Sequence, residues 1–279
     1  MPRQRRFLLL MMSLIIAVGV VTLALSHAAG AADHTAANGG KPTPTSDSRR
    51  SGFEFMSAST QALQKDDTQN PGMLWVKDGE ALWNRSAGKA AKSCADCHGA
   101  APASMRGVAT RYPAFDAPLQ RPVNLSERIN LCRTNRQHAE SFAAESQELL
   151  GIESYVAYQS RGMPIAASLD PRLQPALERG ANAYHRRIGQ LDLSCAQCHD
   201  EHAGGRLGGS LIPQAHPTGY PIYRLEWQGL GSLQRRLRNC LTGMRAEPFA
   251  YGAVEFTELE IYLAQRAAGL RWETPGVRP

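Results

Sequence analysis

Two stretches of the chain, Leu149–Tyr158 and Phe256–Ala267, have apolar residues at the spacing of an amphipathic helix. Side chains that recur with this period lie on one helix face and pack it against a partner. We therefore predict that both stretches are helices and that an aromatic residue of each packs on an earlier helix. With little sheet expected, the predicted fold class is mainly α.

The partner helices are predicted over about residues 79–89 and 177–188. Each contains a glycine followed four residues later by an aromatic residue, and this spacing places the two on one face. The pairs are Gly79 with Trp83 and Gly180 with Tyr184. Because glycine has no side chain, it would let another helix cross closely at that point.

The N-terminus has the order of a secretory signal peptide. Arginines precede an apolar stretch over Phe7–Leu25, and small residues follow it. This order predicts a signal peptide over residues 1–31, with cleavage near Ala29-x-Ala31, and therefore export to the periplasm. The alternative is an uncleaved anchor helix, because the apolar stretch is nearly long enough to span a bilayer.

Residues 32–70 are predicted to form a polar N-terminal extension. They are rich in Thr, Ser, Gly, Pro, Asp and Lys and have no sustained apolar period. Such a segment has too few apolar residues to form a core of its own, so we expect it to be mobile rather than wrapped around a partner, which is the alternative. The rest of the chain is long enough for two modest domains.

All six cysteines fall into one pattern that occurs twice. Each half has the motif C-x-x-C-H followed by a lone cysteine. The residues are Cys94, Cys97 and His98 with Cys132 in the first half, and Cys195, Cys198 and His199 with Cys240 in the second. In this motif both thiols attach a haem covalently and the imidazole becomes an axial iron ligand. Two motifs predict two covalently bound haem c groups.

The repeat extends beyond the haem motifs. Leu125, Arg128 and Cys132 align with Leu233, Arg236 and Cys240. We therefore predict two tandem cytochrome c-like domains related by duplication, over residues 71–167 with haem 1 and residues 168–279 with haem 2. Zinc binding by the paired motifs is disfavoured, because both carry the adjacent histidine and the protein is predicted to be exported.

The sixth ligand of each iron decides between an electron carrier and an enzyme. A small cytochrome c usually supplies a methionine, and Met163 lies where it is expected. The equivalent of Met163 in the second half is Leu270, which has no lone pair for iron. The lone cysteines recur at equivalent positions, so we predict that Cys132 and Cys240 are the axial ligands.

Other assignments compete with thiolate ligation. A disulfide between Cys132 and Cys240 is plausible in an oxidising compartment, although equivalent residues of tandem domains would then need a near-symmetric contact. Methionine ligation, with Met244 in the second half, would make a plain dihaem electron carrier. A haem without a sixth ligand would instead indicate a peroxidase. His202 and His216 are expected to lie at the surface or to contact the iron ligands without binding iron themselves.

Arginines gather around the second lone cysteine. Arg236 lies four residues before Cys240, so a helix would place guanidinium and sulfur on one face. A fixed cation lowers a thiol pKa and can hold an anionic substrate. Of the neighbouring cations, Arg245 is a candidate helper, whereas Arg235 and Arg238 are expected to be solvated or to meet haem propionates.

The overall charge adds little to this picture. The formal net charge is +6, and removal of the predicted signal peptide would lower it. A mild positive balance gives no reason to expect nucleic acid binding. The anionic partner is therefore sought at the arginines beside the cysteine.

A long run of the second half resembles the SoxA family, cytochrome subunits of bacterial thiosulfate-oxidising systems. The run contains His199-Asp200, Gly208-Gly209, the segment His216–Trp227 and the segment Gly231–Glu247. Retention of the first C-x-x-C-H motif makes the chain similar to the dihaem members.

This resemblance implies an L-cysteine S-thiosulfotransferase, which joins thiosulfate oxidatively to a cysteine of the SoxYZ carrier. It implies that Cys240 is the catalytic residue, carried as a cysteine persulfide on the second haem iron, and that Arg236 binds substrate. It also implies a heterodimer with SoxX, which passes the electrons to a soluble cytochrome c. The first haem would then be structural or an evolutionary remnant.

Overall fold

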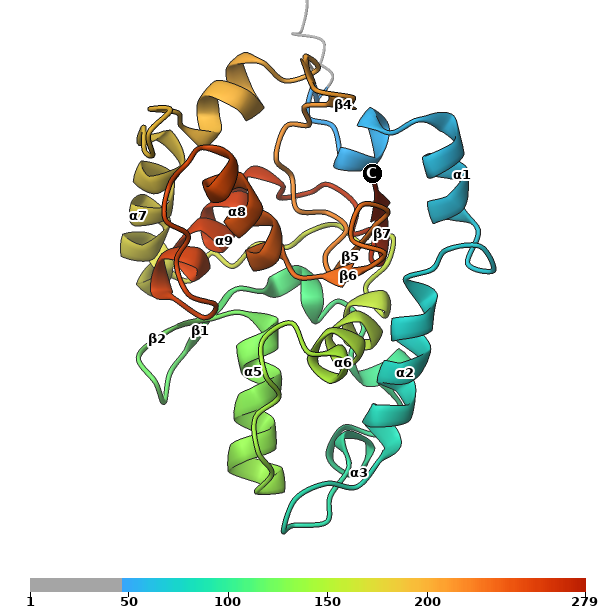
Figure 1. Ribbon diagram of the computed structural model, residues 1–279. Coiled ribbons are helices and arrows are strands. Elements are labelled where there is room, and N and C mark those ends of the chain that lie inside the picture. The colour runs from blue at the N-terminus through green and yellow to red at the C-terminus, as the bar shows by residue number, and fades with distance from the viewer. Residues whose placement is uncertain (1–46) are drawn as a thin grey trace, which may run out of the picture. The chain divides into compact units, whose positions relative to one another are not determined.

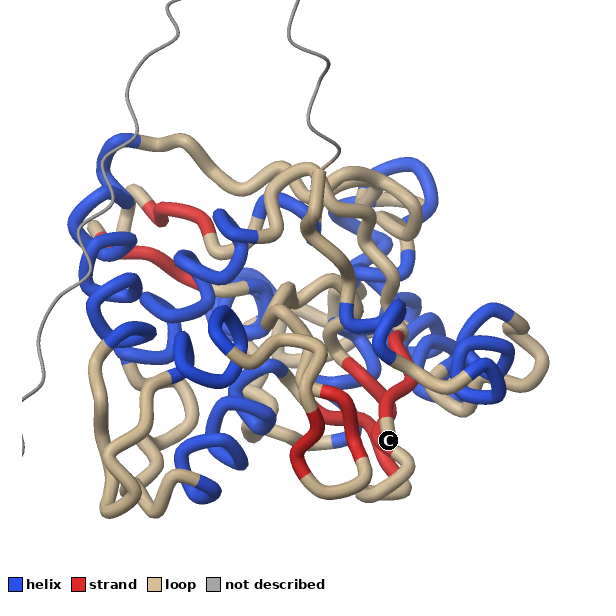
Figure 2. The backbone as a smooth tube through the Cα atoms, turned by 90° about the horizontal axis from the view of Figure 1, so that it is seen from above, coloured by secondary structure: helices blue, strands red, loops and turns tan. Residues whose placement is uncertain are grey.

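Helices dominate the part of the chain that the computed structural model describes, residues 47–279. Seen from above, the few short strands lie among helices and long loops (Figure 2). The predicted signal peptide lies outside these residues. Within them, no helix is both long enough and apolar enough to cross a bilayer. The prediction of a mainly α fold is confirmed.

Both halves contain a first helix, a helical turn at the haem motif, a hairpin, the cysteine helix and a last helix in the same order, with further short elements that differ. Before the first half come η1 (Gly52–Phe55) and α1 (Ala58–Lys65). The first half contains α2 (Met73–Asn84), α3 (Cys94–His98), α4 (Ala101–Ser104), η2 (Ala109–Arg111), β1 (Ala114–Asp116), β2 (Arg121–Val123), α5 (Leu125–Cys132), the π-helical turn η3 (Arg133–Gln137) and α6 (Gln147–Tyr158). The second half contains η4 (Pro171–Leu173), α7 (Gln174–His185), the π-helical turn η5 (Gln197–Glu201), β3 (Arg206–Leu207), β4 (Ser210–Leu211), β5 (Ile222–Arg224), β6 (Gly229–Gly231), α8 (Leu233–Gly243), α9 (Val254–Arg266) and β7 (Gly276–Arg278).

A close helix crossing organises each half. Helix α2 packs on α6 and α7 packs on α9 (Figure 1). A Cβ atom on Gly79 would lie only 2.1 Å from the carbonyl oxygen of Gly151, and one on Gly180 only 2.1 Å from that of Glu258. No side chain fits at either crossing, so the predicted role of both glycines is confirmed.

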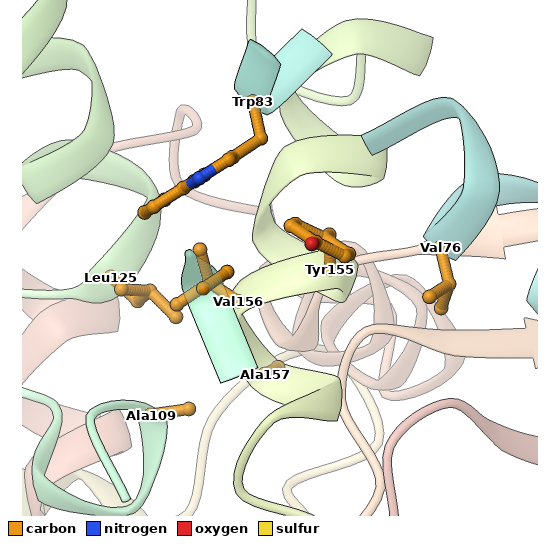
Figure 3. Close-up of a cluster of buried hydrophobic side chains, with 8 residues drawn as sticks. Val76, Trp83, Ala109, Leu125, Tyr155, Val156 and Ala157 are labelled. Carbon is orange, nitrogen blue, oxygen red and sulfur yellow. The ribbon is translucent and has the colours of Figure 1, made fainter. Parts of the chain in front are cut away.

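The aromatic residues beside these glycines fill the two cores. The rings of Trp83 and Tyr155 lie 6.0 Å apart, and those of Tyr184 and Tyr262 lie 5.2 Å apart. Figure 3 shows Trp83 and Tyr155 among the apolar side chains of the first core. Such tilted pairs stabilise a core beyond the area that they bury. The packing of each later helix on the earlier one is therefore as the sequence predicts.

The helix boundaries differ from the prediction at both ends. Helix α2 begins at Met73 and ends at Asn84, earlier than the predicted 79–89. Beyond it a tight turn closes with a bridge between Ala87 and Lys92, and Gly88 there has a φ of +65°. The second half is displaced in the same way, since α7 ends at His185. The residues that the periodicity assigns to the end of each helix therefore form the turn before the haem motif instead.

A β-hairpin precedes the cysteine helix in both halves. Strands β1 and β2 pair with Ala114 opposite Val123. Strands β5 and β6 pair with Ile222 opposite Gly231, so each partner lies 108 positions beyond its counterpart in the first hairpin. The C-terminal strand β7 adds to the second hairpin alone, parallel to β5. The duplication thus extends to the register of the hairpins.

The described part of the polar extension, residues 47–70, is folded rather than mobile. The Asn70 side chain donates to the carbonyl of Pro275 at 3.0 Å, and the Gln64 side chain accepts from the amide of Val277 at 2.8 Å. Both amide side chains are buried. These two polar groups anchor the segment to the backbone of the distant residues 275–277, at the start of the C-terminal strand. An apolar pattern does not reveal such contacts.

The two halves are joined through the segment that follows α9. An isolated bridge pairs Pro164 with Arg271, and the amide of Trp272 donates to the carbonyl of Met163 at 2.9 Å. The Trp272 side chain packs against the core of the first half. Residues from the end of the second half thus complete the core of the first half. The predicted domain boundary between residues 167 and 168 therefore stays a prediction.

Candidate functional site

A cavity of about 600 Å³ in the second half brings together the predicted ligands of the second iron. His199, Arg236 and Cys240 all line it. Helix α8 positions two of them, because Ser232 caps its first turn by accepting from the amide of Arg235 at 3.1 Å. The helical spacing then places the guanidinium and the sulfur in the same cavity, as the sequence predicts.

His199 is oriented as an iron ligand would be. Its Nδ1 donates to the carbonyl oxygen of Pro213 at 2.6 Å, which leaves Nε2 as the nitrogen that can bind a metal. The Cys240 thiol interacts with the same imidazole by a hydrogen bond. The apolar side chains of Leu211 and Leu237 also line the cavity. An apolar wall, two attaching thiols and two facing donors are the set that haem c requires, so the residues fit it.

The thiol of Cys240 is held toward its ionised form. Burial alone would raise its pKa, but the hydrogen bond with His199 and the positive charges of Arg236 and Arg224 outweigh burial and lower the pKa. An arginine beside a thiolate stabilises the anion in the way that activates cysteines elsewhere. The second half therefore holds a sulfur that can bind iron and react.

The attaching cysteines lie beside the same sulfur. Burial raises the pKa of Cys195 to about 11, and the charge of nearby Cys240 adds to this effect. All six cysteines, each within the described residues, are unpaired. The alternative of a disulfide between Cys132 and Cys240 is therefore wrong for this structure, in which each lone cysteine lies with its own haem motif.

The first half places its motif at an open surface. Cys132 interacts electrostatically with Cys94 and Cys97, so the lone thiol again lies beside the attaching pair. His98 is exposed, with its ring 5.8 Å from that of Trp83. The corresponding histidine of the second half, His199, is partly buried. The first site has the same donors as the second but lies at the surface.

The methionines of the alternative assignment lie away from the cavity. Met244 is 7% exposed and packs in the apolar core of the second half. Met163 lies against Gly107, and its carbonyl accepts from Trp272. Neither lines the cavity around Cys240. The structure therefore favours cysteine over methionine in the second half.

The other arginines near the cysteine have separate partners. Arg235 stacks 4.2 Å above the ring centre of Trp227, and Arg238 stacks 4.8 Å from that of Tyr251. Arg245 follows the end of α8 and does not line the cavity. Of the four arginines that surround Cys240 in sequence, Arg236 is the one in the cavity.

Three further residues of the cavity escape the sequence patterns. They are Arg224 on β5, the nearby Tyr220, and His216, which is 8% exposed and donates through Nδ1 to the carbonyl of Arg50 at 2.7 Å. His202, by contrast, is exposed and donates to the carbonyl of Gln197. The signals in the sequence are the position of these residues between the haem motif and the cysteine helix and their place in the segment His216–Trp227, which carries the family resemblance.

Comparisons with known proteins show the family to which this chain belongs. The family model described as SoxA/TsdA, cytochrome c domain, matches residues 78–165 and 179–272. The L-cysteine S-thiosulfotransferase subunit SoxA of Rhodovulum sulfidophilum is 38% identical over 242 residues, covering 85% of this chain and 84% of that protein. The subunit of the same name from Paracoccus pantotrophus is 36% identical over 234 residues, covering 84% and 80%.

A solved structure extends the agreement to three dimensions. The crystal structure of SoxXA from P. pantotrophus contains a chain that matches this one with a TM-score of 0.80 and 35% sequence identity, covering 83% of this chain and 87% of that chain. The regions that the family model matches contain both C-x-x-C-H motifs and both lone cysteines. This chain therefore belongs to the SoxA family of cytochromes c.

Proposed function

We propose that this protein joins thiosulfate oxidatively to a cysteine of a SoxYZ-type carrier, as an L-cysteine S-thiosulfotransferase. The relatives that cover most of the chain have this activity in their names. The observation that carries the proposal is the convergence of Arg236, Cys240 and His199 on one cavity. A cation, a reactive sulfur and an iron ligand meet there.

The proposed cofactors are two covalently bound haem c groups. The first would be attached by Cys94 and Cys97 with His98 and Cys132 as axial ligands, and the second by Cys195 and Cys198 with His199 and Cys240 as axial ligands. Haem, when bound, supplies a one-electron acceptor whose potential its axial ligands set. We propose that Cys240 is present as a persulfide.

In this proposal the protein's own residues hold and orient the reactants. Arg236 binds the oxygen atoms of thiosulfate through its planar fork of donors. The sulfur of Cys240 forms a transient sulfur–sulfur bond with the substrate, and exchange then moves the group to the carrier cysteine. A bond forms between the terminal sulfur of thiosulfate and the carrier sulfur. Formation of the bond between Cys240 and thiosulfate removes two electrons, which bound haem would accept one at a time. The exchange breaks this bond, and the carrier thiol loses its proton.

The electrons need an acceptor outside this chain. The chain from P. pantotrophus that matches this one was solved as part of SoxXA, so we propose a heterodimer with a SoxX subunit that passes electrons to a soluble cytochrome c. Export to the periplasm, with cleavage of residues 1–31, belongs to the same proposal. Haem attachment through C-x-x-C-H motifs supports this location.

The proposal is tested by replacing each lone cysteine separately. Cys240→Ala should abolish thiosulfate-dependent reduction of cytochrome c in the presence of SoxX and the carrier, while both haems stay attached. Cys132→Ala is the matched control, because it removes the equivalent thiol and should mainly alter the spectrum of the first haem. Full activity of Cys240→Ala would refute the mechanism. Near-infrared absorption of methionine-ligated iron would instead support the alternative, a dihaem electron carrier.

A further inference from the structure

The hairpin and cysteine helix form one unit that occurs twice with the same register. In both units the last residue of the first strand is opposite the first residue of the second: Asp116 faces Arg121, and Arg224 faces Gly229. The cysteine helices then place Arg128 and Arg236 at equivalent positions. The two units can therefore be compared side chain by side chain.

In the first unit the arginine before the cysteine is neutralised. Arg128 forms an ion pair with Asp116, whose side chain is only 4% exposed. The amide of Leu119 also donates to this carboxylate, at 2.8 Å. A hydrogen-bonded ion pair of this kind leaves little capacity for another anion. The charge of Arg128 is thus already balanced by Asp116 within the protein.

In the second unit the charge at the strand position is reversed. Arg224 occupies the strand position of Asp116, and it interacts electrostatically with Arg236 as a like charge, whereas Arg128 is paired with a carboxylate. Both arginines line the cavity of Cys240. No carboxylate of the described residues lies within ion-pair distance of Arg236, whereas Arg224 meets Glu226, which is 60% exposed.

Arg224 also has donor capacity that the protein does not use. Its side chain is 12% exposed, and its Nε atom is buried without a hydrogen-bond partner among the described residues. A buried donor left without a partner is costly. Burial and the nearby charge of Arg236 lower the pKa of Arg224, and the charges of Glu226 and Cys240 offset part of this effect. The Nε atom without a partner is therefore available to donate to an anion in the cavity.

We propose that Arg224 and Arg236 together form a two-guanidinium site for a dianionic sulfur oxyanion beside Cys240. The inference rests on the proposed function and deepens it, because it assigns a second substrate-binding residue and the charge of the substrate. Arg224 binds a second edge of the anion, and the two cations match its two negative charges. The same arrangement excludes this role for the first half, where Asp116 takes the place of the anion.

The experiment measures anion binding directly on the intact holoprotein. Thiosulfate, and separately sulfate as an unreactive dianion, is titrated into the wild type and its variants by calorimetry. Arg224→Gln should weaken binding of both by roughly tenfold to a hundredfold, the loss expected for a charge-assisted hydrogen bond. Arg224→Asp should remove binding, because it recreates the ion pair of the first half, where that pair is folded and stable.

The matched control is Arg235→Gln, which removes one positive charge from the neighbouring position of α8 but outside the cavity. Its thiosulfate affinity should stay within about twofold of the wild type, as for other partly exposed charges. The absorption spectra of both haems should be unchanged in all three variants.

Two results would overturn the assignment. One is equal thiosulfate affinity of the wild type and Arg224→Gln. The other is a shifted haem potential with unchanged affinity, which would make Arg224 a partner of a haem propionate. The proposed thiosulfotransferase function fails on a different readout, namely the absence of carrier-dependent turnover in the wild type.

Discussion

Two glutamates between the halves, the buried Glu260 and the partly buried Glu153, should make the stability of this protein fall as pH rises. Glu153 and Glu260 occupy equivalent positions of α6 and α9 and line a cavity of about 300 Å³ between the two halves. Ser126 donates to Glu153, and its counterpart Gln234 donates to Glu260 at 2.9 Å. Each carboxyl is thus held by the cysteine helix of its own half.

Burial decides the protonation of both groups. It raises the pKa of Glu153 from 4.5 to about 8, with smaller contributions from the charges of Glu260 and Glu145. It raises the pKa of Glu260 to about 7. Because both pKa values are higher in the folded state than in the unfolded chain, folding favours the protonated forms. Their stabilising contribution is complete below pH 4.5 and is lost as pH rises to 7 and 8.

The magnitude follows from the two pKa values. Each pH unit between the unfolded and folded values costs about 1.4 kcal/mol per group. The full loss is therefore at most about 5 kcal/mol for Glu153 and about 3 kcal/mol for Glu260. Glu153→Gln and Glu260→Gln keep an oxygen that accepts the same hydrogen bonds but cannot ionise. They should remove this part of the pH dependence.

The assay is denaturant unfolding of the holoprotein at intervals between about pH 4.5 and 9. The two variants should gain stability over the wild type as pH rises, with the larger gain for Glu153→Gln above its pKa of about 8. Glu178→Gln, which changes an exposed glutamate of α7, is the control and should follow the wild type. Parallel curves for the wild type and both buried variants would show that these carboxyls ionise freely in the folded state.

The crossings and the N-terminal segment allow further predictions. Gly79→Ala and Gly180→Ala should each lower the free energy of unfolding by about 1 to 3 kcal/mol in thermal denaturation, because the methyl group meets a backbone carbonyl. Gly243→Ala, where a Cβ meets open space, should not. Asn70→Ala should cost about 1 to 3 kcal/mol and expose the segment to proteases, since the Asn70 side chain binds the carbonyl of Pro275, just before the C-terminal strand. Replacement of exposed Gln69 should leave cleavage unchanged, and equal cleavage of both variants would contradict the anchoring role.

The fold could be predicted wherever a local pattern reports a packing contact. Gly79 and Gly180 mark the two crossings because an absent side chain and an aromatic neighbour are visible in the sequence itself. The ends of α2 and α7 could not be placed in the same way. There the helix ends because a tight turn begins before each haem motif. In the first half a bridge between Ala87 and Lys92 closes this turn, and Gly88 in it has a positive φ.

The site residues that share one helix could be predicted from the sequence. Those that come from different elements could not. Arg236 could be assigned because it shares α8 with Cys240, four residues away. Arg224 and His216 come from a strand and a loop, and His216 is fixed by the backbone of Arg50, far away in sequence. The reversal of charge between Asp116 and Arg224 is present in the sequence. It gains meaning only when the structure shows that the two hairpins have the same register.

The duplication explains why two similar haem sites should have different roles. Both halves keep the attaching thiols, the histidine and the lone cysteine, so iron ligation alone does not distinguish them. The halves differ in the surroundings of the lone cysteine. In the first, Arg128 is paired with Asp116 and His98 is exposed. In the second, the arginine has no internal carboxylate among the described residues and lies in a cavity with its sulfur. In our proposal, a single change of charge on one strand therefore distinguishes a site whose residues suit iron ligation alone from one whose residues suit an anion as well.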